Sequence, residues 1–105
     1  MPLVELLWWE GCPSTADARE LLARVLAEEG LDPAVIELRE VPSEVDAQRE
    51  RFVGSPTIRI DGHEVAPQPA EPAALTCRVY HLRDGRISPT PDPEDVRDAV
   101  RQAVA

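Results

Sequence analysis

The feature of the sequence that most constrains its fold is an apolar segment near the N-terminus, LVELLWW at residues 3–9. A run with so few polar residues predicts a strand covered on both faces, as in parallel or mixed sheets with helices on each side. Pro13 then suits the first turn of a helix, apolar residues recur at helical spacing, and Gly30 suits a C-terminal cap, which predicts a helix over residues 13–29. Residues 34–41 alternate as a strand, so this part of the chain predicts a strand–helix–strand unit with parallel strands.

The rest of the chain predicts a second helix, two hairpins and a third helix. Ser43 opens a capping-box pattern at the start of a short, mostly polar helix over residues 43–52. Asp-Gly pairs at residues 61–62 and 84–85 stand between alternating segments, which is a strong hairpin signal. The last segment, residues 92–104, has an N-capping aspartate, a first-turn proline and an apolar stripe at helical spacing.

Together these elements predict an α/β fold with a four-stranded mixed sheet. The strand over residues 3–9 is central, and a strand over residues 57–61 runs antiparallel to it. Helices 13–29 and 92–104 lie on one face of the sheet, and helix 43–52 lies on the other. A chain of 105 residues with no repeat and no composition boundary predicts a single domain, residues 1–105.

Composition and charge argue against several classes of function. The net charge of −9 argues against binding to nucleic acid or anionic membranes, and the longest uncharged apolar stretch, residues 6–9, is too short to span a bilayer. The N-terminus has no basic region, so we expect no signal peptide and a cytoplasmic location in which Cys12 and Cys77 are reduced. The spacing of cysteine and histidine predicts no metal site. All eleven basic residues are arginine, which is typical of GC-rich bacterial genomes.

Two motifs carry a family resemblance. Gly11-Cys12-Pro13 follows the first strand, and Gly54-Ser55-Pro56-Thr57 precedes the third. With the element order above, they resemble the thioredoxin fold in its small glutaredoxin-like form, a three-layer α/β/α domain around a four-stranded mixed sheet. The whole chain is similar to a group of short bacterial thioredoxin-family proteins that also carry a CR-x-Y segment, here residues 77–80. Some members of that group are loosely labelled alkylmercury lyase-like.

The resemblance implies a substrate-binding site around residue 56. In the family the bond before this proline is cis, the proline packs against the reactive sulfur, and the backbone of the preceding residue pairs with a bound thiol peptide. Here those residues are Pro56 and Ser55. We assign Thr57 and Trp9 to the same substrate-binding site.

Cys12 is the predicted nucleophile. A helix start stabilises a thiolate and lowers the pKa of a cysteine placed there. Thr15 stands where a dithiol motif would have its second cysteine, so we expect Ser14 and Thr15 to donate hydrogen bonds to the thiolate instead. The acidic neighbour Glu10 opposes the lowered pKa. A buried, inert cysteine is the alternative.

Cys77 is the only other thiol and the predicted resolving residue. The loop over residues 66–74 holds three prolines, which favour an extended path long enough to cross the sheet. We therefore expect Cys12 and Cys77 to lie near enough for a reversible disulfide, which requires Cα atoms within about 7 Å. The alternative is a cysteine that fills the edge of the core. Arg78 is expected either to lower the pKa of its neighbour Cys77, to bind a carboxylate, or to be a solvated edge residue.

Three functions remain open. The first is a thiol–disulfide oxidoreductase in which Cys12 attacks a thiol or disulfide substrate, including a protein, and Cys77 or a small thiol such as glutathione or mycothiol resolves. No other cofactor is expected, and the sequence leaves the oligomeric state open. The second is a module without turnover that binds a thiol peptide, a soft metal ion or a protein partner. The third is an organomercurial-cleaving enzyme that uses Cys12, Cys77 and Glu10. The first predicts that Cys12 is alkylated faster than Cys77.

Overall fold

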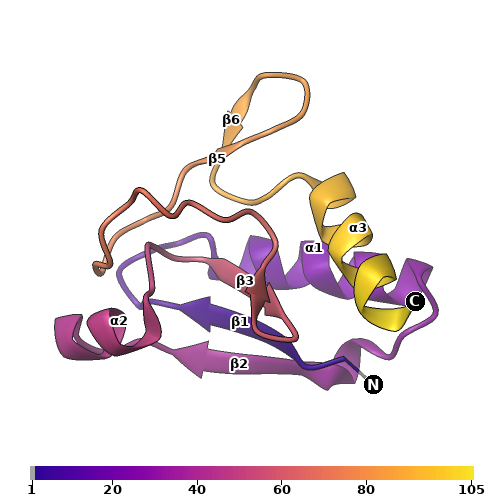
Figure 1. The fold of residues 1–105 in the computed structure, drawn as a ribbon, viewed down its shortest axis with the longest axis horizontal. Coiled ribbons are helices and arrows are strands. Elements are labelled where there is room, and N and C mark those ends of the chain that lie inside the picture. Colours follow the sequence, from indigo (N-terminus) through magenta and orange to yellow (C-terminus); the bar gives the residue numbers. More distant parts are fainter. Residues whose placement is uncertain (1) are drawn as a thin grey trace.

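The computed structural model describes residues 2–105 and contains a four-stranded sheet whose central strand is the apolar N-terminal segment (Figure 1). The order across the sheet is β2-β1-β3-β4. β1 pairs in parallel with β2 and antiparallel with β3, and β3 continues into β4 through the Asp-Gly turn. The prediction of a mixed α/β fold is therefore confirmed. The strands of this sheet are β1 (Val4–Trp8), β2 (Ile36–Glu40), β3 (Thr57–Ile60) and β4 (His63–Glu64).

The helices and the second hairpin occur in the predicted order. A two-stranded sheet forms around the second Asp-Gly pair and projects from the body of the molecule (Figure 1). No helix within residues 2–105 is long and apolar enough to cross a membrane. The remaining elements are α1 (Thr15–Glu28), the short 3-10 helix η1 (Pro33–Val35), α2 (Glu44–Glu50), β5 (Tyr80–His81), β6 (Ile87–Ser88) and α3 (Pro93–Val104).

Two elements start two residues later than predicted. Helix α1 begins at Thr15 rather than residue 13, because the chain first makes a turn in which the Cys12 N–H donates to the Trp9 carbonyl at 3.1 Å. The second strand begins at Ile36 rather than residue 34, because the Asp32 side chain accepts a hydrogen bond from the Ala34 N–H and caps the start of η1. Local side chain–backbone bonds of this kind compete with regular structure.

The core lies on both faces of the sheet. Along β1 successive side chains alternate in direction, so Leu6 faces α1 and α3 while Leu7 faces the opposite side. The larger cluster holds Leu6 together with the apolar stripes of α1 and α3. The smaller cluster comprises Leu7, Val41, Ala47 and Phe52, with Ala47 contributed by α2. The predicted placement of two helices on one face and the short helix on the other is confirmed.

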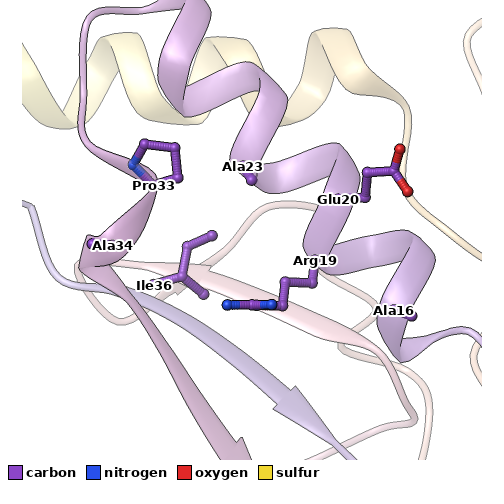
Figure 2. A pocket seen from close by; sticks show the side chains of 7 residues that line it. All are labelled: Ala16, Arg19, Glu20, Ala23, Pro33, Ala34 and Ile36. Atoms are coloured by element: carbon purple, nitrogen blue, oxygen red, sulfur yellow. The ribbon is translucent and has the colours of Figure 1, made fainter.

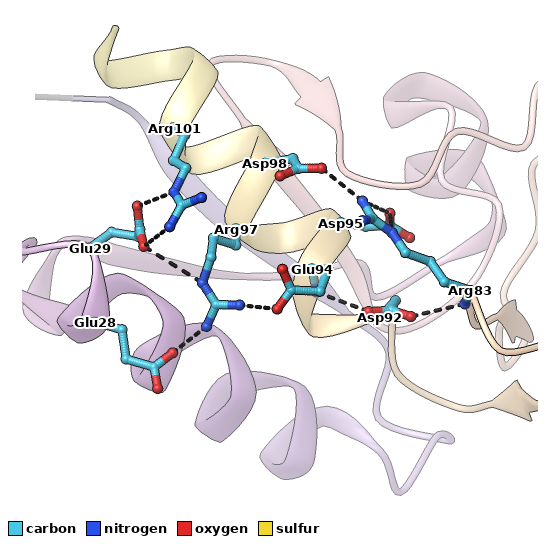
Figure 3. Close-up of polar contacts among 9 residues, drawn as sticks. All are labelled: Glu28, Glu29, Arg83, Asp92, Glu94, Asp95, Arg97, Asp98 and Arg101. Atoms are coloured by element: carbon cyan, nitrogen blue, oxygen red, sulfur yellow. Dashed lines mark hydrogen bonds and ion pairs between the residues drawn. The ribbon is translucent and has the colours of Figure 1, made fainter.

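Charged side chains bind α3 to its neighbours at the surface (Figure 3). Arg101 reaches Glu29, the residue that caps the end of α1, at 2.7 Å, and Arg97 reaches Glu28, the last residue of α1, at 2.5 Å. Arg83, in the β5–β6 hairpin, forms ion pairs with Asp95 and Asp98 of α3, each at 2.8 Å. These contacts tie α3 and the hairpin to the rest of the domain, and in each of them at least one of the two side chains is exposed.

Candidate functional site

The turn after β1 places Cys12 beneath the surface at the end of the sheet. Its side chain is only 6% exposed. Gly11 allows this turn, because a Cβ atom at that position would overlap the Trp9 ring. The indole of Trp9 therefore lies flat against the Gly11 backbone, and it packs at the edge of the smaller core cluster. An alanine at position 11 would push the ring or the turn away and displace Cys12 with it.

The loop before β3 meets Cys12 from the other side. The Ser55–Pro56 bond is cis, as the resemblance implies. The Cys12 thiol donates to the Ser55 carbonyl at 3.3 Å, and the Ser55 hydroxyl accepts from the Trp9 N–H at 3.0 Å. Thr57 closes the loop, since its hydroxyl donates to the Gly54 carbonyl at 2.6 Å. These bonds hold the Cys12 sulfur against the backbone of residue 55.

A third segment brings Cys77 to the same place. The Ser55 N–H donates to the Thr76 carbonyl at 2.8 Å, and the Arg78 N–H donates to the Ser55 carbonyl at 2.9 Å, so Cys77 pairs with Ser55 as a single parallel bridge. Gly54 permits the approach: it has a φ of +141°, and a Cβ there would lie 3.1–3.2 Å from Arg78 atoms. The backbone that the resemblance assigns to a bound thiol peptide is therefore paired with this chain's own residues.

The two thiols shift each other's pKa in opposite directions. Burial by itself raises the pKa of Cys12, because an apolar environment disfavours the thiolate. Hydrogen bonding with the Cys77 thiol, with Ser14 and with Ser55 outweighs burial, and the pKa of Cys12 falls below its ordinary value. The same thiol–thiol interaction, with burial and the charge on Cys12, raises the pKa of Cys77 to about 11. As the pH rises, Cys12 therefore loses its proton first, while Cys77 stays protonated.

Of the two predicted hydrogen-bond donors, only Ser14 acts on Cys12. Both the backbone and the side chain of Ser14 lower the Cys12 pKa. The Thr15 hydroxyl is buried and has no hydrogen-bond partner in the described part of the chain. The reason is the later helix start: Thr15 is the first residue of α1, and its side chain lines a groove on the far side of Cys12.

Cys77 is held in place by a buried arginine. Arg78 is 3% exposed, and its guanidinium bonds to Glu64 at 2.6 Å, to the Thr57 hydroxyl at 3.0 Å and to the Ala66 carbonyl. The prediction of a solvated edge residue is wrong, because Glu64 and these acceptors supply partners to both terminal nitrogens of the guanidinium in place of water, while its Nε has no partner in the described part of the chain. The carboxylate it binds belongs to the protein itself.

Tyr80 completes this anchor. Its ring lies under the Arg78 guanidinium, with 4.7 Å between the guanidinium carbon and the ring centroid. Its hydroxyl donates to the Pro56 carbonyl. Burial raises the pKa of Tyr80, so the hydroxyl keeps its proton and remains a donor. We call Arg78, Tyr80, Glu64 and Thr57 the Arg78 cluster; it joins the Cys77 segment to the loop that carries residues 55 and 56.

A shallow apolar groove of about 380 Å³ opens on the other side of Cys12. Trp8 of β1 and Leu38 of β2 form one wall, and the start of α1 forms the other. Leu38 is 48% exposed. Trp8, rather than the assigned Trp9, therefore lines the groove beside Cys12, because alternation along β1 turns the two rings to opposite faces.

The assigned residues Cys12, Cys77, Ser55, Pro56 and Ser14 thus converge at one point. Glu10 is exposed in the turn after β1, and residues 2–105 contain no group of three or more His, Cys, Asp or Glu that could hold a metal ion. Sequence reasoning missed the anchoring role of Arg78 and Tyr80. The available signal was their spacing, since residues two apart on an extended segment share a face.

Comparison of the chain with protein-family models, with curated proteins and with solved structures finds no match.

Proposed function

We propose that the protein is a thioredoxin-like thiol–disulfide oxidoreductase in which Cys12 is the nucleophile and Cys77 the resolving thiol. One observation carries the proposal. The two cysteines, far apart in sequence, both lie beside Ser55, and their pKa values shift in opposite directions. A thiolate is the attacking species in disulfide exchange, and a protonated neighbour stabilises it.

The first step is attack on an external disulfide. The Cys12 thiolate forms a bond to one sulfur of the substrate RS–SR, the substrate S–S bond breaks, and RS⁻ leaves and takes a proton from solvent. The product is a mixed disulfide between Cys12 and one half of the substrate. Since Cys12 now carries no charge, the interaction that raised the pKa of Cys77 is lost, and that pKa falls toward the ordinary thiol value of about 8.5.

The second step closes the intramolecular disulfide. Cys77 loses its proton to solvent and attacks the Cys12 sulfur, the mixed disulfide breaks, and the second RSH leaves. Two protein thiols are oxidised while one substrate disulfide is reduced to two thiols. The cycle is completed by an external thiol, which fits the reducing cytoplasm expected for this chain. The pKa of Cys77 thus rises or falls with the state of Cys12, which sets the order of the two attacks.

The test is to trap each step. We expect bis(hydroxyethyl) disulfide to convert the protein to a monomeric Cys12–Cys77 disulfide, detected by mass spectrometry as a loss of two hydrogens. Cys77→Ser should stop at a mixed disulfide on Cys12, and Cys12→Ser should react far more slowly. Absence of any adduct on Cys12 at neutral pH would disprove the proposal and favour a binding module without turnover.

A further inference from the structure

We propose that the groove beside Cys12 continues into a carboxylate-binding subsite at Arg19, so that the preferred substrates are small disulfides with an anionic end. The inference rests on the proposed function and adds the substrate class. A substrate can reach the Cys12 sulfur from one side only. One side of Cys12 faces Ser55, whose backbone N–H and carbonyl are both paired with residues 76 and 78. The groove lined by Trp8 and Leu38 is the open approach to the sulfur.

The groove does not end at Cys12. A second hollow, of about 500 Å³, lies along α1 and the η1–β2 segment and shares Ala16 and Arg19 with the first. Each volume falls within the range of about 300–1,000 Å³ that is typical of small-molecule sites. Apolar side chains line most of both hollows, including Leu38 in the first and Ile36 in the second. A ligand with an apolar arm can therefore extend from the Cys12 sulfur toward Arg19.

Arg19 supplies the charge at the junction. Figure 2 shows its guanidinium extending from α1 toward Ile36, while the carboxylate of Glu20 points away from it. Arg19 is exposed and forms no ion pair with any side chain of residues 2–105. In a chain with a net charge of −9, a cation without an acidic partner beside a reactive sulfur is complementary to an anionic ligand. A guanidinium also matches a carboxylate with two parallel hydrogen bonds.

The test compares three small disulfides that differ in charge: dithiodipropionate (anionic), bis(hydroxyethyl) disulfide (neutral) and cystamine (cationic). The measured quantity is the rate at which each oxidises Cys12 at low ionic strength. Arg19→Gln should lower the ratio of the anionic to the neutral rate by about 2- to 5-fold, the range expected for one exposed ion pair. Arg19→Lys should keep most of the ratio, and cystamine should respond in the opposite direction.

The matched control is Arg24→Gln. Arg24 is exposed on the same helix and lines neither hollow, and its removal changes the net charge equally. We expect it to leave the ratio unchanged. Equal effects of the two variants would overturn the subsite, because only the long-range field would then act, and an unchanged ratio in Arg19→Gln would also overturn it. Oxidation by the neutral disulfide is independent of the subsite, so its absence would instead disprove the proposed function.

Discussion

Two of the regions in which arginine binds carboxylates, the Arg78 cluster and the α1–α3 surface, differ in how far solvent reaches the ion pair. In the Arg78 cluster one guanidinium is buried, faces an aromatic ring and holds three acceptors from three segments of the chain. At the α1–α3 surface Arg97 and Arg101 meet the glutamates of α1 where solvent reaches their partners (Figure 3). An arginine–carboxylate pair therefore lies in a low-dielectric interior in one region and is partly exposed to water in the other.

The comparison shows which charges position the candidate site. Removing one partner of a buried pair leaves a desolvated charge or acceptors with nothing to bind, and this strongly destabilises a protein. Exposed pairs contribute little, since water and salt screen them and ordering two long side chains costs entropy. Arg78 is adjacent to Cys77, so the buried interaction is the one that holds the proposed resolving thiol. The surface pairs link α3 to the end of α1 and to the β5–β6 hairpin.

The largest expected effect comes from Arg78→Met. This change leaves Glu64 without its partner and should lower the free energy of unfolding by about 3 kcal/mol, the low end for a broken buried pair because water still reaches Glu64. Urea titration measures the loss. The double variant Arg78→Met/Glu64→Gln should recover part of it, and the exposed Arg86→Met is the matched control. A single variant as stable as wild type would contradict the role given to the cluster.

A smaller loss is expected for Tyr80→Phe. The ring under Arg78 stays, but the Pro56 carbonyl loses its donor, which costs about 1–3 kcal/mol for a buried acceptor left unsatisfied. Tyr80→Leu should lose more, since it also removes the cation–π contact. Unfolding followed by tryptophan fluorescence distinguishes the two variants. Equal stability of Tyr80→Phe and the wild type would show that the hydroxyl contributes nothing.

The next prediction concerns the negative charge on the Cys12 thiolate, beside the Cys77 that the Arg78 cluster holds. Cys77→Ala removes a hydrogen-bond donor from the Cys12 thiolate, so the pKa of Cys12 should rise and its alkylation profile should move to higher pH. Cys77→Ser keeps a hydroxyl donor and should move the profile less. Residue-specific alkylation rates, measured by mass spectrometry across pH, give the three midpoints. In the wild type, Cys12 should react well before Cys77, whose pKa is about 11; identical midpoints would contradict the pairing.

The smallest effect is expected at the surface. Arg101→Gln removes the contact with Glu29, but the Arg101 side chain is 61% exposed, so water can take its place and the free energy of unfolding should hardly change. The interaction with Arg101 lowers the pKa of Glu29, so whatever stability it supplies is present above the unfolded-state pKa of a glutamate and disappears as the pH falls through the lower folded-state value. Thermal unfolding of Arg101→Gln and the wild type at neutral pH, in low and high salt, measures the stability that the contact supplies. A loss comparable to that of Arg78→Met would remove the distinction between the two regions.

By itself the sequence determined the elements that depend on neighbouring residues. The apolar run of residues 3–9 predicted a buried strand, the periodicity of residues 13–29 an amphipathic helix, and the Asp-Gly pairs both hairpins. The sequence also placed Cys12 at the start of this helix, whereas in the structure Cys12 lies in the turn before it. These features follow from local geometry, because backbone dihedral angles and side-chain periodicity act over a few residues.

Only the tertiary structure decided where Cys77 and Arg78 lie. The loop before them has no periodicity, so its length showed that it could reach Cys12 but its sequence did not give its direction. That direction comes from Ser55, which pairs with residues 76 and 78, and from Glu64, which binds the arginine in the interior. An arginine is buried only where distant segments supply enough acceptors, and that supply exists once β3, β4 and the Cys77 segment have come together.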